Sequence, residues 1–320
     1  MTGIIAGTDA YAIGYVDGIS DQNIASPSWH EGLNGESYFA NFFASTWLPA
    51  GHIKYARYVV PWTAMGETQG PGTYPTRYME WCAEAKKYGL VLDMAPTTYT
   101  ASFPKTTAEY KQDLSALITA PQCSGSIAYV EAWNEPNGGK TLLTPLKDAE
   151  YTLAAYELCK TLGCHVIAGD FVDYRSESEI AKYEDEYAAG LKGLNISDWA
   201  IHPYTSVDIE TFARVQEFVN HMPQSKKLWF TEVGAYKCER GENYLFRNPA
   251  EQGEHANWLV NQLSPHFNPD HVFYYQFISR NCSGRSSAGQ GSGLVQGSSR
   301  AWRMQRMLRG GRAMRSWRRW

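Results

Sequence analysis

The sequence predicts an α/β fold, a single (β/α)8 TIM barrel. Short apolar stretches alternate with amphipathic stretches along nearly the whole chain of 320 residues. The repeat is about 30 to 36 residues long, which suits one strand followed by one helix. No Gly-rich phosphate-binding fingerprint follows the first strand, and its absence counts against the competing doubly wound open sheet.

Each predicted element follows from its own pattern. The strands are short, apolar and β-prone: residues 12–16, 53–61, 90–96, 127–135, 165–171, 198–203, 227–233 and 271–278. The helices are amphipathic, and Gly89 and Gly163 end two of them: residues 36–48, 75–88, 107–118, 146–162, 176–194, 209–221 and 252–263. An eighth helix is expected to begin near Ser299.

The charge is uneven along the chain. Through Asp270 there are 19 Lys and Arg against 33 Asp and Glu, a net charge of −14, whereas the last fifty residues carry ten Arg and no acid. An acidic body argues against nucleic acid as a partner of the folded part, because phosphate binding needs clustered Lys and Arg. We therefore expect one domain over residues 1–298 and a separate Arg-rich segment over 299–320.

That terminal segment repeats Arg every third residue from Arg300 to Arg318. This spacing winds positive charge around a helix instead of holding it on one face. We expect the final barrel helix followed by a disordered tail. Contact with an anionic membrane or an acidic polymer is the alternative.

The sequence also bears on compartment. No run of 18 apolar residues is present, so we expect no transmembrane segment. No signal peptide is recognisable, so the protein is secreted if this is a mature chain and otherwise cytoplasmic.

The cysteines lack metal-site spacing. We expect Cys82, Cys159 and Cys164 to be buried thiols and consider a disulfide between Cys238 and Cys282 as an alternative to two free thiols.

Two predicted strands end in glutamate. Glu135 follows an apolar run and precedes Pro136, which cannot donate a ladder hydrogen bond. Glu232 ends the strand that begins at Lys227, and lies 97 residues, or three repeats, beyond Glu135. In a closed barrel the fourth and seventh strands face each other across the mouth. Two carboxyl groups about 5 to 5.5 Å apart are what a retaining glycosidase needs, and a wider gap would imply inversion.

These stretches resemble a known family. Trp133-Asn-Glu-Pro-Asn137 and Trp229-Phe-Thr-Glu-Val-Gly234 are similar to the acid/base and nucleophile motifs of clan A glycoside hydrolases, closest in style to families 39 and 5. The resemblance covers the chain to about residue 280. It implies that Glu135 is the acid/base, that Glu232 is the nucleophile and that Asn134 holds the 2-hydroxyl of the substrate. It implies no metal and no organic cofactor.

The resemblance extends to other strands. Arg57 resembles the second-strand arginine that hydrogen-bonds the nucleophile and keeps it ionised. His202-Pro-Tyr204 resembles the His and Tyr pair of the cleft, in which Tyr204 can hydrogen-bond the nucleophile, and a satisfied core histidine is the alternative for His202. The eighth strand lacks the Trp that often floors the sugar site, and Tyr275 or Gln276 could take its place.

For several other side chains the sequence is compatible with two roles. Trp62 is either a sugar platform or part of the core. We expect Glu131 to form structural hydrogen bonds instead of acting in catalysis. Asp17, Asp93 and Asp170 lie at or near strand ends, where lining the cleft and capping loops are equally good interpretations.

Together these features predict a retaining β-glycoside hydrolase that cleaves a poly- or oligosaccharide. Its 11 Trp and 21 Tyr suit sugar binding, although most will be core. An endo-acting enzyme on a β-glucan, mannan or xylan is preferred. The alternatives are an exo-acting β-glycosidase such as a β-xylosidase, a non-catalytic carbohydrate-binding barrel, and a membrane- or nucleic-acid-associated protein that binds through the tail. The oligomeric state is not predicted.

Overall fold

The chain folds as an α/β barrel. In the computed structural model the described residues are 18–20, 53–275, 278–279 and 295–296, apart from 71–72, 101, 139–140, 175, 192, 224–225 and 235–248. Parallel strands β2 to β8 pair in sequence order, and the short strand β1 pairs with both β2 and β8. Because the first strand pairs with the last, the alternative of an open sheet is wrong.

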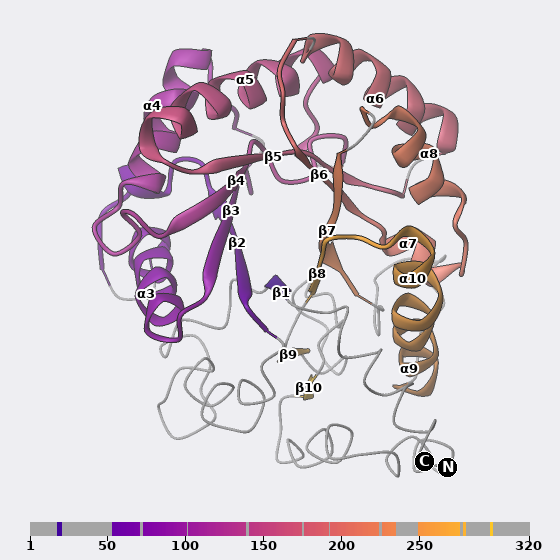
Figure 1. Cartoon of the computed structure of the whole chain (residues 1–320). Helices are drawn as coiled ribbons and strands as arrows, with labels where there is room; N and C mark the ends of the chain where they lie inside the picture. Colours follow the sequence, from indigo (N-terminus) through magenta and orange to yellow (C-terminus); the bar gives the residue numbers. More distant parts are fainter. Residues whose placement is uncertain are drawn as a thin grey trace.

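The strands curl inside an arc of helices (Figure 1). They are β1 (Gly18–Ser20), β2 (Tyr55–Pro61), β3 (Val91–Thr97), β4 (Ile127–Glu131), β5 (His165–Val172), β6 (Asp198–His202), β7 (Lys227–Val233), β8 (His271–Tyr274), and the separate pair β9 (Ile278–Ser279) and β10 (Val295–Gln296). The helices are η1 (Ala64–Gly66), α3 (Tyr74–Lys87), α4 (Thr107–Ile118), α5 (Pro145–Leu162), α6 (Glu177–Gly190), α7 (Tyr204–Asp208), α8 (Ala213–His221), α9 (Pro249–Trp258), the π-helical turn η3 (Leu259–Leu263) and α10 (Ser264–Phe267).

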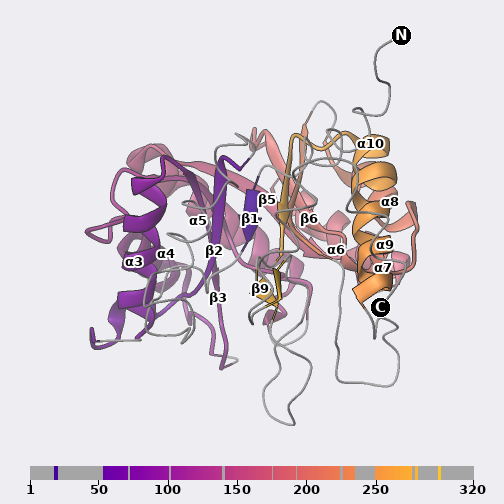
Figure 2. The ribbon, with the colours of Figure 1, turned by 90° about the horizontal axis from the view of Figure 1, so that it is seen from below.

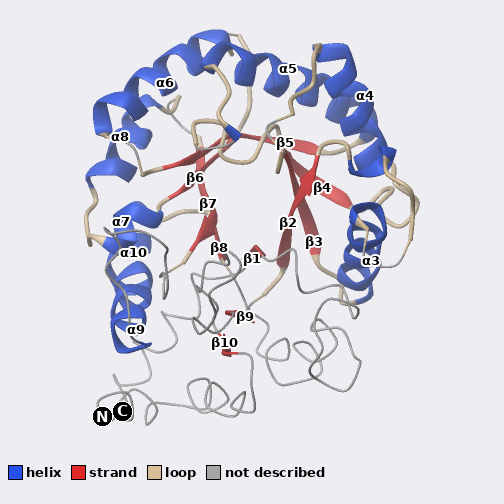
Figure 3. Cartoon of the chain, turned by 180° about the vertical axis from the view of Figure 1, so that it is seen from behind, coloured by secondary structure: helices blue, strands red, loops and turns tan. Residues whose placement is uncertain are grey.

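Local sequence explains where several helices begin. The Thr106 hydroxyl accepts a hydrogen bond from the Glu109 amide at the start of α4, and Ser176 forms a capping box with Glu179 at the start of α6. Turned by 90°, α3 and α4 lie to one side of the strands and α8, α9 and α10 to the other (Figure 2). Seen from behind, the described helices form an arc outside the strands, from α3 at one end to α9 and α10 at the other (Figure 3).

Most predicted elements agree with the structure within a few residues, but some boundaries were wrong. The fourth strand ends at Glu131, four residues before Glu135, because the chain turns there. The predicted helix 209–221 begins four residues later, as α8 at Ala213, and the separate short helix α7 precedes it. The predicted strand 12–16, the helix 36–48, the helix near Ser299 and the Arg-rich segment lie outside the described residues.

The barrel interior has an apolar lower layer. Ile167, Ala200, Trp229 and Phe273 pack there, with Tyr55 and Tyr129 against them. A much larger core fills the space between strands and helices. Because side chains alternate along a strand, residues two positions after the lower layer point into the same barrel, closer to its mouth. The lower layer therefore supports the site above it.

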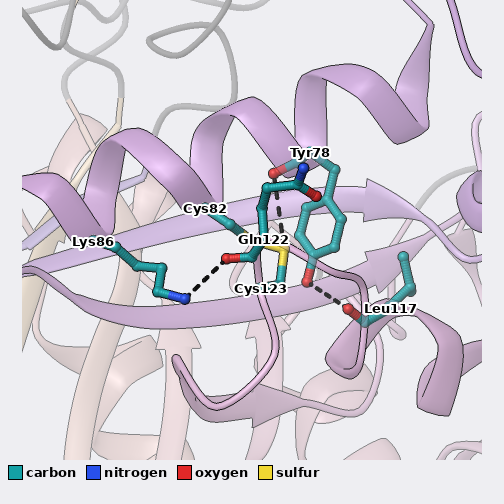
Figure 4. Close-up of a disulfide and its surroundings, with 6 residues drawn as sticks. All are labelled: Tyr78, Cys82, Lys86, Leu117, Gln122 and Cys123. Atoms are coloured by element: carbon teal, nitrogen blue, oxygen red, sulfur yellow. Dashed lines mark hydrogen bonds between the residues drawn. A yellow bond between two sulfur atoms is a disulfide. The ribbon is translucent and has the colours of Figure 1, made fainter.

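Two disulfides correct the expectation of buried thiols. Cys82 on α3 is bonded to Cys123 after α4, where the Tyr78 hydroxyl donates to the Leu117 carbonyl oxygen (Figure 4). Cys159 is bonded to Cys164 across the end of α5. Cys82, Cys159 and Cys164 are buried as expected, but sequence spacing does not reveal that the paired Cα atoms lie only 5.1 and 4.5 Å apart. Cys238 and Cys282 lie outside the described residues.

Within the described part of the chain, no helix combines the length and apolar character needed to cross a membrane.

Candidate active site

A layer of polar side chains lies above the apolar floor of the barrel. It follows from strand alternation: Arg57 comes two residues after Tyr55, Glu131 two after Tyr129, and His202 two after Ala200. These three polar side chains are fully buried. Charged groups in such a place need partners, because desolvating an unpaired charge is costly. The partners come from the neighbouring strands.

Arg57 is the centre of this layer. Its Nε donates to Glu131 Oε2 at 2.9 Å, its Nη1 to Glu232 Oε2 at 2.6 Å, and its Nη2 to Asn134 Oδ1 at 2.9 Å and Asp170 Oδ2 at 3.0 Å. A guanidinium suits this role because its donors are arranged in a rigid planar fork. The predicted bond to Glu232 is present, and so is the structural role expected for Glu131.

Glu232 ends β7 and is held by a second donor. The Tyr204 hydroxyl donates to Glu232 Oε1 at 2.9 Å, as the sequence predicted. Burial raises the pKa of Glu232, His202 and Arg57 lower it, and the net direction is upward. We expected Arg57 and Tyr204 to keep this carboxyl ionised. Both do lower its pKa, but burial outweighs them.

Glu135 faces Glu232 from the loop after β4. Its backbone φ of 48° lies in the left-handed region, and its carbonyl oxygen accepts from the Gly138 amide at 2.9 Å and the Thr141 hydroxyl at 2.7 Å. One carboxylate oxygen of Glu135 and one of Glu232 lie within 4.8 Å of each other. The Glu135 side chain is 25% exposed, so this acid is open to a ligand while Glu232 is nearly covered.

His202 links Glu135 to the buried charges. Its Nδ1 lies 3.1 Å from Glu135 Oε1, and its Nε2 contacts Asp170 and lies 3.2 Å from the Thr231 hydroxyl. Burial lowers the pKa of His202, but the carboxylate of Asp170 and the hydrogen bonds raise it to about 10. The raised pKa favours the imidazolium form, in which both ring nitrogens can donate. His202 is fully buried with both nitrogens partnered, as a satisfied core histidine would be, and it also contacts Glu135.

The other predicted side chains are less central. Trp62 is 7% exposed and its Nε1 donates to the Ser102 carbonyl oxygen at 2.8 Å, so it belongs to the core and the platform interpretation is wrong. Tyr275 is half-buried and packs edge-on against Tyr204, with ring centroids 6.3 Å apart. Gln276 lies outside the described residues, as does Asp17.

Two acids that the sequence left open are buried beneath the pair. Asp93 lies 3.9 Å from Arg57 Nε, and burial raises the pKa of Asp93 to about 7. Asp170 accepts from Arg57 and His202, and although burial raises its pKa, those two cations lower it below its ordinary range. Sequence reasoning missed Thr231, whose hydroxyl donates to Asp170 at 3.3 Å. A Thr two residues after Trp229 was the signal, since that position points into the barrel.

Solved structures of glycoside hydrolases share this fold. A family 39 glycoside hydrolase from the gut symbiont Bacteroides cellulosilyticus WH2 has a TM-score of 0.57 at 16% identity, and the match covers 89% of this chain and 61% of that one. A β-1,3-glucanosyltransferase from Rhizomucor miehei, an active-site mutant with laminaritriose, scores 0.56 at 10% identity and 88% and 93% coverage. A β-mannanase from Thermomonospora fusca scores 0.52 at 15% identity and 88% and 83% coverage.

No protein-family model and no curated protein sequence matches the chain. The chain spans about three fifths of the length of the family 39 structure. At these identities the likeness shows the fold, which is the fold of clan A glycoside hydrolases that the motifs predicted.

Proposed function

We propose that this protein is a retaining β-glycoside hydrolase, with Glu135 as acid/base and Glu232 as nucleophile. The observation that carries the proposal is the approach of the two carboxylates to within 4.8 Å at the barrel mouth. Retaining glycosidases hold their carboxyl groups about 5 to 5.5 Å apart, whereas inverting enzymes leave about 6.5 to 9.5 Å for a water molecule. The fold shared with glycoside hydrolases supports the same reaction class.

The proposed reaction has two steps. Glu232 attacks the anomeric carbon while Glu135 gives its proton to the leaving oxygen, and a glycosyl ester forms on Glu232. Glu135 then takes a proton from water, which attacks the anomeric carbon and releases Glu232. Arg57 and Tyr204 hold the two oxygens of Glu232 in place, and Asn134 lies beside them to meet the sugar 2-hydroxyl.

His202 assists by occupying one face of the acid/base. It contacts Glu135 Oε1, which leaves the second oxygen of Glu135 for the leaving group or water. The proposed steps use the two carboxyls alone as acid/base and nucleophile, and they involve no metal or organic cofactor.

We further propose an endo-acting cleft on a β-linked glucan, mannan or xylan. Tyr99 after β3 and Tyr174 after β5 are 43% and 40% exposed at the carboxyl ends of their strands, where they can stack on sugar rings. In this proposal residues 1–298 make up the catalytic (β/α)8 barrel. The two disulfides support folding in an oxidising compartment, because cytosolic thiols are kept reduced.

The test combines kinetics with product analysis. Glu135→Gln and Glu232→Gln should each abolish hydrolysis of a β-linked oligosaccharide, whose leaving group needs a proton, while near-UV circular dichroism stays native. Glu184→Gln, a buried carboxyl on α6 outside the site, is the matched control and should keep full activity. Proton NMR of the first product should show the β anomer. Full activity in either site variant, or an α product, contradicts the proposal.

The substrate needs a separate screen. Linear β-glucan, mannan and xylan are offered at equal mass, and the products are separated by length. Early oligosaccharides of mixed length indicate endo cleavage, and a monosaccharide as sole early product contradicts it.

A further inference from the structure

Strand β5 is irregular at its carboxyl end. Its pairing with β6 joins Gly169 to Ala200 and then Phe171 to Ile201, so Asp170 is an extra residue between two regular pairs. Gly169 and Asp170 have φ values of 91° and 62°, both in the left-handed region. This conformation costs free energy for Asp. A bulge of this kind turns a side chain away from the direction that regular alternation would give it.

The bulge has a specific effect on the barrel interior. Ile167 belongs to the apolar floor, so regular alternation would place Gly169 in the polar layer, where it has no side chain to offer. A Cβ atom at Gly169 would lie 2.7 Å from the Ala200 carbonyl oxygen, so only glycine fits. The extra residue instead brings the Asp170 carboxylate into the layer, where it is 1% exposed.

Asp170 reaches the two halves of the candidate pair at once. Arg57 Nη2 donates to its Oδ1 and Oδ2 at 3.1 and 3.0 Å, and the same guanidinium binds Glu232 at 2.6 Å. His202 Nε2 contacts Asp170 Oδ1, and the other ring nitrogen lies 3.1 Å from Glu135. One carboxylate is therefore joined to each acid through a single intervening side chain.

We propose that Asp170 is a positioning residue that holds His202 against Glu135 and Arg57 against Glu232, so that one bulged carboxylate orients both acids. This inference rests on the proposed function of those two glutamates. Asp170 is buried, with 1% of its surface exposed, so its loss should act on turnover and leave substrate binding nearly intact.

The charged groups around Asp170 and His202 determine in which direction the pKa of His202 changes when Asp170 is replaced. The ionisable groups that act on His202 are Asp170, Glu135 and Glu232. Those that act on Asp170 are Arg57 and His202, with Glu131, Asp93 and Asp148 nearby. An amide at position 170 removes the anion that contacts Nε2. The imidazolium then loses its strongest stabilising partner, and its proton is released at lower pH.

The experiment compares Asp170→Asn with Glu184→Gln, which also changes a buried carboxyl to an amide but lies on α6 outside the barrel mouth. On an aryl β-glycoside we expect kcat to fall about 100-fold or more and KM to stay within about threefold. In ¹⁵N NMR the His202 ring should titrate well below its wild-type midpoint. The control should change neither readout.

A second variant covers the case in which Asp170→Asn does not fold. Asp170→Glu keeps the anion on a longer arm, so we expect His202 to titrate as in wild type while kcat still falls. Wild-type kcat in folded Asp170→Asn, or an unchanged His202 titration, overturns the inference even if Glu135→Gln is inactive. If Glu135→Gln and Glu232→Gln are active, the proposed function fails instead, and the NMR titration still decides whether Asp170 holds His202.

Discussion

Replacing Arg57 with lysine tests how much the buried guanidinium contributes. The arginine donates to Glu131, Glu232, Asn134 and Asp170. A lysine ammonium has three donors on a single nitrogen, against five spread over the guanidinium fork, so it cannot serve all of these acceptors. We expect about two buried acceptors to lose their hydrogen bonds. Each costs about 1 to 3 kcal/mol, so the free energy of unfolding should fall by about 2 to 6 kcal/mol.

Urea unfolding at fixed pH measures this loss, and kinetics on an aryl β-glycoside measure its effect on Glu232. We expect kcat/KM to fall about 10- to 1,000-fold, because the nucleophile loses a donor on one oxygen. Lys111→Met is the control: Lys111 and Glu157 are also 2.6 Å apart, but their side chains are 40% and 65% exposed. That exposed pair should contribute nothing measurable.

The Arg57–Glu232 pair and the Lys111–Glu157 pair have the same N–O distance of 2.6 Å but differ in burial. A larger loss of stability in Arg57→Lys than in Lys111→Met therefore reflects burial and not distance. If the free energy of unfolding of Arg57→Lys lies within about 1 kcal/mol of wild type and its kcat/KM is unchanged, the four hydrogen bonds of Arg57 do not hold the site as described.

Three further predictions concern stability. Changing Cys82 and Cys123 to Ser opens a loop of 41 residues and should cost about 4 kcal/mol in urea unfolding, and an unchanged midpoint would contradict this. Burial raises the pKa of Glu184 from its ordinary 4.5 to about 8, so the folded state holds this proton more tightly and stability falls as pH rises from about 4.5 to 8. Glu184→Gln should therefore add up to about 5 kcal/mol at pH 9 and little at pH 4, and an equal gain at both would show that Glu184 is not the cause. Gly169→Ala should lower the thermal midpoint by several degrees, because its Cβ meets the Ala200 carbonyl oxygen at 2.7 Å, and native stability would argue against the bulge as described.

The strand ends were the most predictable part of the site. Apolar runs followed by Glu135 and Glu232, three repeats apart, were enough to place two acids at one end of a barrel. The exact turn was not predictable: β4 stops at Glu131, and Glu135 adopts a left-handed backbone that nothing local requires. The sequence also did not show that Trp62 belongs to the core, because its indole Nε1 donates a hydrogen bond to the Ser102 carbonyl oxygen on another loop.

The disulfides show the same limit. Cys82 and Cys123 are separated by 41 residues, and only the packing of α3 against the segment after α4 brings them together. Residue spacing carries no information about such a contact, so burial was predictable and bonding was not.

By itself, the sequence determined the order of strands and helices, the α/β barrel class and the two glutamates at strand ends, because hydrophobic periodicity and turn residues act locally. The tertiary structure decided which charges share the interior. Arg57, Asp170, His202 and the two glutamates come from five different strands or their loops, and their protonation depends on distances of about 3 Å that only barrel closure creates. The bulge that brings Asp170 into this group is a property of the pairing between β5 and β6, and so it appears only in the folded chain.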